Sequence, residues 1–490
     1  MQKQLLYTTL ILAILSITAI SCKKDFIEAN TDPNTSEFVL PQTLLAPALT
    51  KTVTYNMRRA QRITNELMQV TVYMGDTEGK IFRYEIRVSE ADYLWNNWYV
   101  QLTNFKNIYE LASNPANLNV TYQGIALICE AWVFSMLTDT YGDIPYSEAL
   151  KGKQGSLMPK FDSQKDIYLD LYSKLEQANT LLKTAGTTRN VPAFSDPIYG
   201  GNAAKWRKFG NSLYLRLLLR LSNKADVEVA PFVSAKIKEI VDDNAANYPL
   251  IANNAESAVL RWTGTAPYVS PFATWRESDW NRPKIASFFV NNLVEWNDPR
   301  VATWVTKSLG EYAGLPSGYA PGENPQYRSQ LPNALQSEPL LGNILNYSEL
   351  QFMLAELAVR GIISSKDAKT CYEAGITNGI TYWGYTVPAN YLANTSIVWD
   401  EGNSEEEKLR QIHIQKYYSL FFTDLQSWFE YRRTGLLNLP KGNGLKNGGV
   451  MPARLNYPVY LQSANGANYN AAVAAQGPDN ISTQVWWQKP

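Results

Sequence analysis

This chain of 490 residues has very little histidine and cysteine. Its one histidine is His413, and its three cysteines are Cys22, Cys129 and Cys371. A Ser-His-Asp triad, a Cys-His dyad or a two-histidine metal site would have to use that single imidazole. No Cys/His cluster has the spacing of a zinc site. Because His413 lies between two isoleucines in a helical pattern, we interpret it as structural and predict no histidine-based catalysis.

Cys129 and Cys371 fall within helical patterns at distant positions of the chain. Cysteines placed in this way are more often buried free thiols than partners in a disulfide. The chain also lacks the dense set of cysteines that marks a disulfide-stabilised domain. We therefore expect both thiols to be free, and a disulfide between them is the less favoured alternative.

Net charge and flexible linkers are lacking as well. The 45 basic residues balance the 45 acidic residues, so the chain has no basic footprint of a nucleic-acid-binding protein. No Gly/Ser or Pro tract is long enough to separate domains. We predict no nucleic-acid partner and one large folded domain over residues 37–490.

The N-terminal residues have the pattern of an export signal. Lys3 precedes an uncharged apolar run over residues 5–20, and small or aliphatic residues lead into Cys22. The run is shorter than the roughly 20 apolar residues of a transmembrane helix. A cysteine at this position is similar to a bacterial lipobox, so we predict a signal peptide over 1–21, a lipid on Cys22 and a tether over 22–36. The alternative is a plain secretory signal with an incidental cysteine.

Helical periodicity dominates the rest of the chain. Apolar residues recur at spacings of three and four over residues 211–221 and 347–361, which is typical of an amphipathic helix. Strand patterns are scarce, and small alanines at helix-packing spacing indicate antiparallel pairs of the tetratricopeptide type. Further helices are predicted near residues 43–74, 90–112, 120–139, 163–184, 231–243, 283–294, 365–381 and 404–433.

Two long segments, residues 261–280 and 311–339, have no regular periodicity and are rich in aromatic residues. Long irregular segments in a folded domain are often functional, and rigid aromatic side chains lose little entropy when they bind a ligand. We expect at least two of the four large aromatics in the first segment to contact a ligand. The alternative is that a tryptophan fastens its loop to the body. The predicted ligand-binding residues are Trp262, Tyr268, Trp275, Arg276 and Trp280.

Several other residues are interpreted as structural. Asp139 and Asp143 lie at a helix stop and tight turn, where acids commonly bond backbone amides, and a catalytic pair is the less favoured alternative. Arg432 or Arg433 is expected to pair with Glu430 or a nearby carboxylate, although such arginines can also clamp an anionic ligand. We expect core or scaffold positions for Trp95, Trp98, Tyr99, Arg454 and Tyr457. Ligand contact is a less favoured role for the first three of these residues.

Seven short segments form a recognisable series along the chain. They are Asn30–Asn34, Thr138–Ala149, Lys205–Leu217, Tyr347–Glu356, Trp428–Gly435, Arg454–Pro458 and the pair Trp486 and Trp487. In this order they resemble the SusD/RagB-type nutrient-binding outer-membrane lipoproteins of Bacteroidetes, in the branch with the signature YGDIPYSEA. The resemblance covers nearly the whole chain. It departs at Gln488, where an acidic residue is common, and at Leu436, where proline is common.

This resemblance implies a mostly α-helical single domain in which tetratricopeptide-like helix pairs form a scaffold and irregular loops bind the ligand. It implies lipid-anchored display on the extracellular side of the outer membrane, with a SusC-type TonB-dependent barrel transporter as partner. The implied ligand is an oligosaccharide, or in some members a peptide, and no catalytic residue, metal or cofactor is implied. Two alternatives stay open here: a surface glycoside hydrolase using two carboxylates, and a lipid-tethered scaffold for other proteins.

Overall fold

The computed structural model describes residues 40–74, 79–185, 191–326 and 328–489. The folded body is the compact unit over residues 41–490. The predicted signal peptide, the lipid attachment at Cys22 and the tether over residues 22–36 lie outside the described residues.

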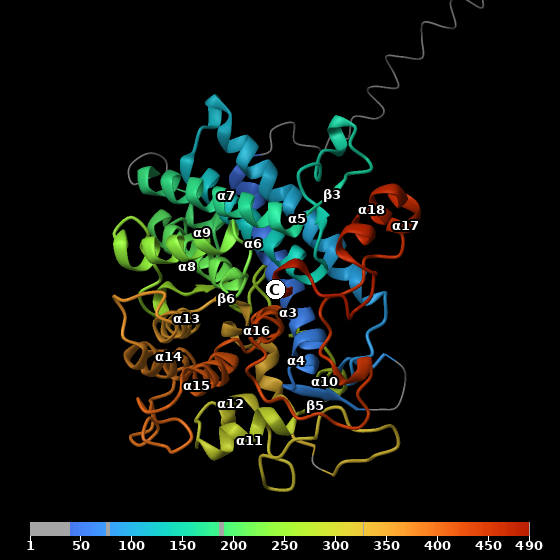
Figure 1. Cartoon of the computed structure of the whole chain (residues 1–490), viewed down its shortest axis with the longest axis vertical. Helices are drawn as coiled ribbons and strands as arrows, with labels where there is room; N and C mark the ends of the chain where they lie inside the picture. The colour runs from blue at the N-terminus through green and yellow to red at the C-terminus, as the bar shows by residue number, and fades with distance from the viewer. Residues whose placement is uncertain (1–39, 75–78, 186–190, 327, 490) are drawn as a thin grey trace, which may run out of the picture. The chain divides into compact units, whose positions relative to one another are not determined.

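Helices make up most of the folded body (Figure 1), so the predicted mostly α-helical class is confirmed. A π-helical turn over Ala60–Thr64 joins the first described helix to the second. In chain order the helices are α3 (Pro41–Arg59), α4 (Asn65–Leu67), α5 (Glu90–Ser113), α6 (Val120–Tyr141), α7 (Gln164–Thr184), α8 (Ala203–Leu221), α9 (Val229–Lys238), α10 (Glu277–Trp280), α11 (Ser287–Glu295), α12 (Val301–Trp304), α13 (Tyr347–Val359), α14 (Ala368–Tyr382), α15 (Glu405–Ser419), α16 (Gln426–Thr434), α17 (Leu461–Ala464) and α18 (Gly466–Gln476).

Short strands form three antiparallel pairs in the described part of the chain. The pairs are β1 (Thr71–Tyr73) with β5 (Pro283–Ile285), β2 (Ile144–Pro145) with β3 (Phe161–Asp162), and β4 (Ala258–Val259) with β6 (Asn343–Leu345). In the first pair, Thr71 lies opposite Ile285. This pairing attaches the chain just after the predicted ligand segment to the region that follows α4.

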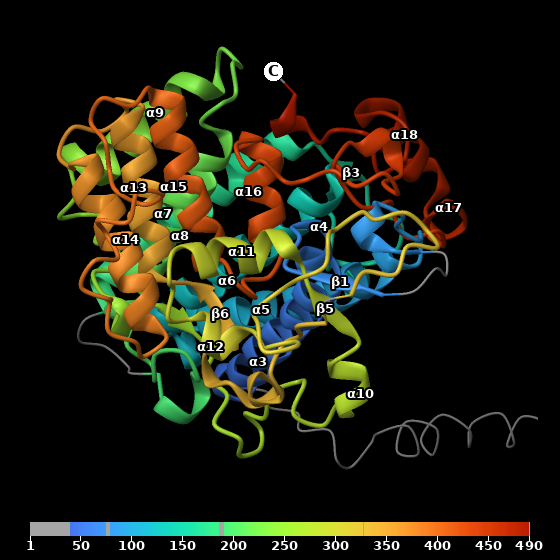
Figure 2. The same ribbon diagram turned by 90° about the horizontal axis from the view of Figure 1, so that it is seen from below.

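The larger helices pack as neighbours in two groups (Figures 1 and 2). The first group runs from α5 to α9 in chain order, and the second contains α13, α14 and α15.

Glycines allow close approach of neighbouring helices in both groups. A Cβ on Gly124 of α6 would lie 2.6 Å from Leu182 of α7, and one on Gly375 of α14 would lie 2.6 Å from Phe352 of α13. Any larger side chain at these two positions would force the helices apart.

Helix α6 lies in the interior of the first group. The side chain of Asn119 caps it by accepting the backbone N–H groups of Thr121 and Tyr122, each at 3.1 Å. By length and composition α6 could cross a membrane, but 94% of its apolar window is buried inside the folded body. Its apolar character on all sides is therefore that of a core helix.

Two predicted helices extend into segments that form strands instead. The prediction over 43–74 holds only to Leu67, because residues 71–73 form β1. The prediction over 283–294 begins too early, because residues 283–285 form β5. These two strands pair with each other, so contact between distant segments overrides the local pattern in both.

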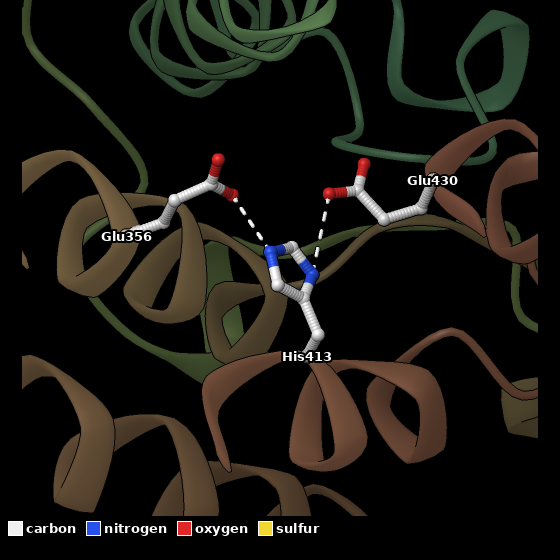
Figure 3. Close-up of side chains that lie close together, drawn as sticks. All are labelled: Glu356, His413 and Glu430. Atoms are coloured by element: carbon white, nitrogen blue, oxygen red, sulfur yellow. Dashed lines mark ion pairs between the residues drawn. The ribbon is translucent and has the colours of Figure 1, made fainter. Parts of the chain in front are cut away.

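The prediction of a single helix over residues 404–433 is also wrong. Phe422 and Asp424, between α15 and α16, have positive φ values of 58° and 37°, which an α-helix cannot contain. In one continuous helix, His413 and Glu430 would lie about 25 Å apart. The turn instead folds α16 back and brings these two side chains together (Figure 3).

Candidate functional site

The turn between α15 and α16 assembles charged side chains in the interior (Figure 3). His413 Nε2 lies 3.3 Å from Glu356 Oε2, and His413 Nδ1 lies 3.6 Å from Glu430 Oε1. The donor atoms of these three residues all lie within 4.8 Å of one another, as the ligands of a metal ion would.

Two cations already share the carboxylates of this cluster. Arg433 donates to both oxygens of Glu356 at 2.7 and 2.6 Å and also contacts Glu430, while Lys416 Nζ lies 2.9 Å from Glu430 Oε1. Burial raises the pKa of Glu356, but Arg433 and His413 outweigh burial and hold that pKa well below its ordinary value. The cluster is therefore a buried ion-pair network, and the structural roles predicted for His413 and Arg433 agree with it.

The two aspartates of the segment Thr138–Ala149 both bond to the scaffold. Asp143 Oδ1 accepts the backbone N–H of Gln164 at the start of α7 at 2.8 Å, which is the predicted capping role. Asp139 instead accepts the hydroxyl of Tyr168 at 2.6 Å and the indole N–H of Trp487 at 2.8 Å. Its prediction as a cap of backbone amides is wrong, because the side chain points into the core between α7 and the C-terminal segment.

The remaining residues interpreted as structural lie in the interior. Trp95 and Trp98 are buried, and the Tyr99 hydroxyl donates to the carbonyl oxygen of Pro145 at 2.7 Å. Arg454 is fully buried and lies 3.2 Å from Asp479, and the neighbouring Tyr457 is buried as well.

Cys129 and Cys371 are buried and free, in agreement with the sequence analysis. Burial raises the pKa of the Cys371 thiol to about 11, and it raises the pKa of the Cys129 thiol well above its ordinary value. Both residues therefore stay as unreactive thiols at neutral pH.

Two of the predicted ligand-binding tryptophans lie in the core. Trp262 is 1% exposed, and its indole N–H points at the sulfur of Met57 in α3 at 3.0 Å. Trp280 is fully buried, and its indole N–H donates to the carbonyl oxygen of Pro332 at 3.1 Å. Neither ring offers a face to a ligand in this structure. Their burial favours the alternative role of fastening the loop to the body, which leaves Tyr268, Trp275 and Arg276 as candidate ligand contacts.

Tyr268 lines a groove of about 830 Å³ beside α3. The half-buried ring of Tyr268 and the ring of Phe194, which is 73% exposed, belong to the apolar wall, whereas Thr50 and Thr54 of α3 supply hydroxyl groups. Apolar walls with a few polar groups are typical of small-molecule sites. The lining is completed by Gln42, Thr43, Ala46, Pro47, Lys51, Arg58, Ala193, Pro197, Pro267, Val269 and Pro271.

Trp275 lines a second and more polar hollow of about 380 Å³. Its half-buried ring packs edge-on against Phe272 with a centroid distance of 5.0 Å, and its carbonyl oxygen accepts the side-chain N–H of Gln336 at 3.0 Å. These contacts hold the indole in place. The other lining residues are Gln61, Arg62, Glu66, Tyr73, Gly79, Lys80, Arg87, Asp279 and Arg282.

One continuous helical stretch supports both cavities. The groove lies against α3, and the hollow lies against the π-turn and α4 that continue it. The irregular segment over residues 261–282 supplies both Tyr268 and Trp275, so the structure brings two predicted residues to the same helical stretch. Arg276 is exposed, precedes α10 and lines neither cavity.

Several lining residues escaped the sequence analysis. Short turns and connections with no periodicity or motif of their own contain Phe194, Lys80 and Arg282. Tyr73 is the last residue of β1, in a segment for which the sequence predicts a helix. The pairing of β1 with β5 brings Tyr73 and Arg282 together, whereas the sequence predicts helices over both of these strands. No local signal could have identified them, because the site forms from segments about 200 residues apart in the chain.

Sequence comparison then assigns the chain to a family. Residues 33–458 match the SusD-like family, described as starch-binding and associating with the outer membrane. The chain belongs to the SusD-like family. SusD-like proteins bind carbohydrate and are not catalytic, so this SusD-like chain is not an enzyme. The predicted membership of the SusD-like family is confirmed, and the glycoside hydrolase alternative is set aside.

Solved structures of SusD homologues share this fold. One from Bacteroides fragilis is 26% identical with a TM-score of 0.76, covering 92% of this chain and 100% of its own. One from Bacteroides uniformis is 26% identical with a TM-score of 0.74, covering 91% and 99%. A chitin-binding homologue from Flavobacterium johnsoniae is 22% identical with a TM-score of 0.80, covering 91% and 98%, and that likeness shows the fold alone. None of the curated proteins matches the sequence significantly.

Proposed function

We propose that this SusD-like chain is a lipid-anchored protein of the outer-membrane surface that captures an oligosaccharide and delivers it to a SusC-type TonB-dependent barrel transporter. The family match over residues 33–458 carries this proposal. Two open cavities with aromatic walls, both beside the segment over residues 261–282, provide a place for the ligand.

In the proposed complex, the sugar chain lies along α3 and the helical turn that continues it. Tyr268 and Trp275 offer ring faces to the apolar sides of sugar rings, and the exposed guanidinium of Arg276 bonds hydroxyl groups near Trp275. Trp262 and Trp280 act from beneath by fixing the segment to Met57 of α3 and to Pro332.

Calorimetry of the mature chain, residues 22–490, tests the proposal. The ligands are chitooligosaccharides, maltooligosaccharides and short peptides, and the same samples are analysed for products. We expect saturable binding of a saccharide without product release. Binding of peptides alone would redirect the proposal to a peptide-capturing member, and binding of none would contradict the capture function.

The two half-buried rings that line the cavities should carry much of this binding. Base stacking on aromatic side chains is worth about 1–3 kcal/mol in nucleic-acid complexes, and we expect a similar range for a sugar on Tyr268 or Trp275. Tyr268→Ala and Trp275→Ala should each weaken binding about 5- to 150-fold. Tyr460→Ala is the matched control, since Tyr460 is 43% exposed and lines neither cavity.

The lipid anchor is tested separately by Cys22→Ala in the full chain. Each buried methylene of an acyl chain contributes about 0.8 kcal/mol to membrane anchoring, so the variant should move from the membrane fraction to the soluble fraction. A variant that stays in the membrane fraction would contradict acylation of Cys22. Co-purification of the wild type with a barrel transporter would support delivery, whereas co-purification with a soluble assembly alone would favour the scaffold alternative.

A further inference from the structure

We propose that the hollow beside Trp275 recognises an anionic group on the captured saccharide, either the carboxylate of a uronic acid or a sulfate ester. This inference rests on the proposed function and deepens it by naming the class of saccharide. It depends on how charge is distributed in the hollow, on what holds the basic side chains there, and on the absence of acidic side chains from the lining of the neighbouring groove.

Basic side chains outnumber acidic ones among the residues that line the hollow. The four basic residues are Arg62, Lys80, Arg87 and Arg282, and the two acidic residues are Glu66 and Asp279. Glu66 is buried and lies 3.3 Å from Arg62. Burial raises the pKa of Glu66 to about 7 despite the opposing effect of Arg62, so near neutral pH it offsets less than one positive charge.

The ring of Tyr73 lies against three of these cations, of which Arg62 is also ion-paired with Glu66 at 3.3 Å and Glu90 at 3.1 Å. Lys80, Arg62 and Arg282 lie 4.4, 5.6 and 5.7 Å from the ring centroid of Tyr73. Arg282 Nη1 also donates to the Tyr73 hydroxyl at 2.6 Å. At Lys80 and Arg282, cation–π contact leaves N–H groups available to a bound anion.

Lys80 and Arg282 form no ion pair with any carboxylate that the structure describes. Lys80 is 4% exposed, and the one described hydrogen bond of its side chain, to the carbonyl oxygen of Met74, is long at 3.4 Å. Burial lowers the pKa of Lys80. A buried ammonium without a carboxylate is costly, and an anion in the hollow would remove that cost.

The groove beside Tyr268 would accept the same ligand. None of its described lining residues is acidic, and Lys51 and Arg58 add two positive charges. A saccharide with acidic groups along its length could therefore extend from the Trp275 ring towards Tyr268 without meeting an opposing carboxylate. Neutral rings would stack on the aromatics, and the anionic substituent would enter the hollow.

Binding of matched saccharides tests the inference in the mature chain. The acidic probes are an oligogalacturonate, a hyaluronan oligosaccharide and a heparin-derived oligosaccharide. Their neutral counterparts are the methyl esters of the first two, and the third is compared with its desulfated, esterified form. We expect at least one acidic probe to bind about tenfold or more tightly than its counterpart, because charge-assisted hydrogen bonds are the stronger ones. The affinity should also fall as salt rises.

Arg282→Gln should abolish this preference for the acidic probe, and Arg261→Gln is the matched control. Arg261 is an exposed arginine of the same segment that lines neither cavity. Equal binding of all acidic and neutral partners would overturn the inference while leaving the capture function intact. A preference that survives in Arg282→Gln would overturn the placement in this hollow. Failure of every saccharide to bind would overturn both the inference and the proposed function.

Discussion

The helical scaffold and the Trp275 hollow use charge in opposite ways. In the scaffold, Arg216 lies 2.6 Å from Glu349, and both side chains are almost completely buried. In the hollow, Lys80 and Arg282 lie against the Tyr73 ring and have no described carboxylate partner. Paired charge between buried helices fixes how the helices pack, whereas unpaired positive charge beside a half-exposed tryptophan is available to a ligand.

The largest loss of stability is expected in the buried ion-pair network around His413. Arg433→Met leaves Glu356 and Glu430 in the interior without the cation that bridges them. Removing one partner of a buried pair costs about 3–5 kcal/mol, and we expect a loss of that size in urea unfolding. Arg410→Gln is the control, because its pair with Glu406 is exposed and should be worth about 0–1 kcal/mol. Equal losses in both variants would contradict the structural role of the network.

Tryptophans of one segment provide the next test. Trp280→Ala removes a fully buried side chain that packs on Phe272 and Phe422, and loss of a buried aromatic costs about 3–5 kcal/mol. Trp275→Ala should cost about 1 kcal/mol or less in unfolding while weakening saccharide binding. The reverse result, with Trp275 needed for stability and Trp280 for binding alone, would contradict the assignment.

The sequence predicted the scaffold well because its signals are local. Apolar spacing located α5, α6 and α7 to within a few residues, and Asn119 and Ser163 are ordinary N-cap residues. The errors lie where distant segments meet. The β1–β5 pairing and the turn at Phe422 and Asp424 depend on tertiary contacts, and no window of sequence reveals them.

The candidate site was predicted in part for the same reason. The lack of periodicity over residues 261–280 marks a segment that borders both cavities. It could not separate Trp262 and Trp280, which turn inward, from Tyr268 and Trp275, which line a surface. That difference is set by Met57 and Pro332, which lie in other parts of the chain.

A smaller effect on stability is expected from the titration of Asp424, a buried carboxyl group of the scaffold. Burial raises the pKa of Asp424 to about 7, against the opposing effect of Arg216. The folded chain therefore keeps a proton on Asp424 that the unfolded chain releases above its ordinary pKa near 3.9. This proton makes the free energy of unfolding fall as pH rises from about 4 to about 7.

Asp424→Asn should remove that contribution. We expect the difference in unfolding free energy between wild type and variant to shift in favour of the variant by about 1–3 kcal/mol between pH 5 and pH 8, since one pKa unit corresponds to about 1.4 kcal/mol. Parallel pH profiles for the two proteins would show that Asp424 titrates normally in the folded chain.

The most direct measurement is a crystal structure of the mature chain with the tightest-binding saccharide of the panel. We expect sugar rings on Tyr268 or Trp275, between α3 with its continuing turn and the segment over residues 261–282. For an acidic saccharide, we expect the anionic group within hydrogen-bond distance of Arg282 or Lys80. A saccharide bound elsewhere, with both aromatic rings uncovered, would contradict the central claim that this segment forms the ligand site.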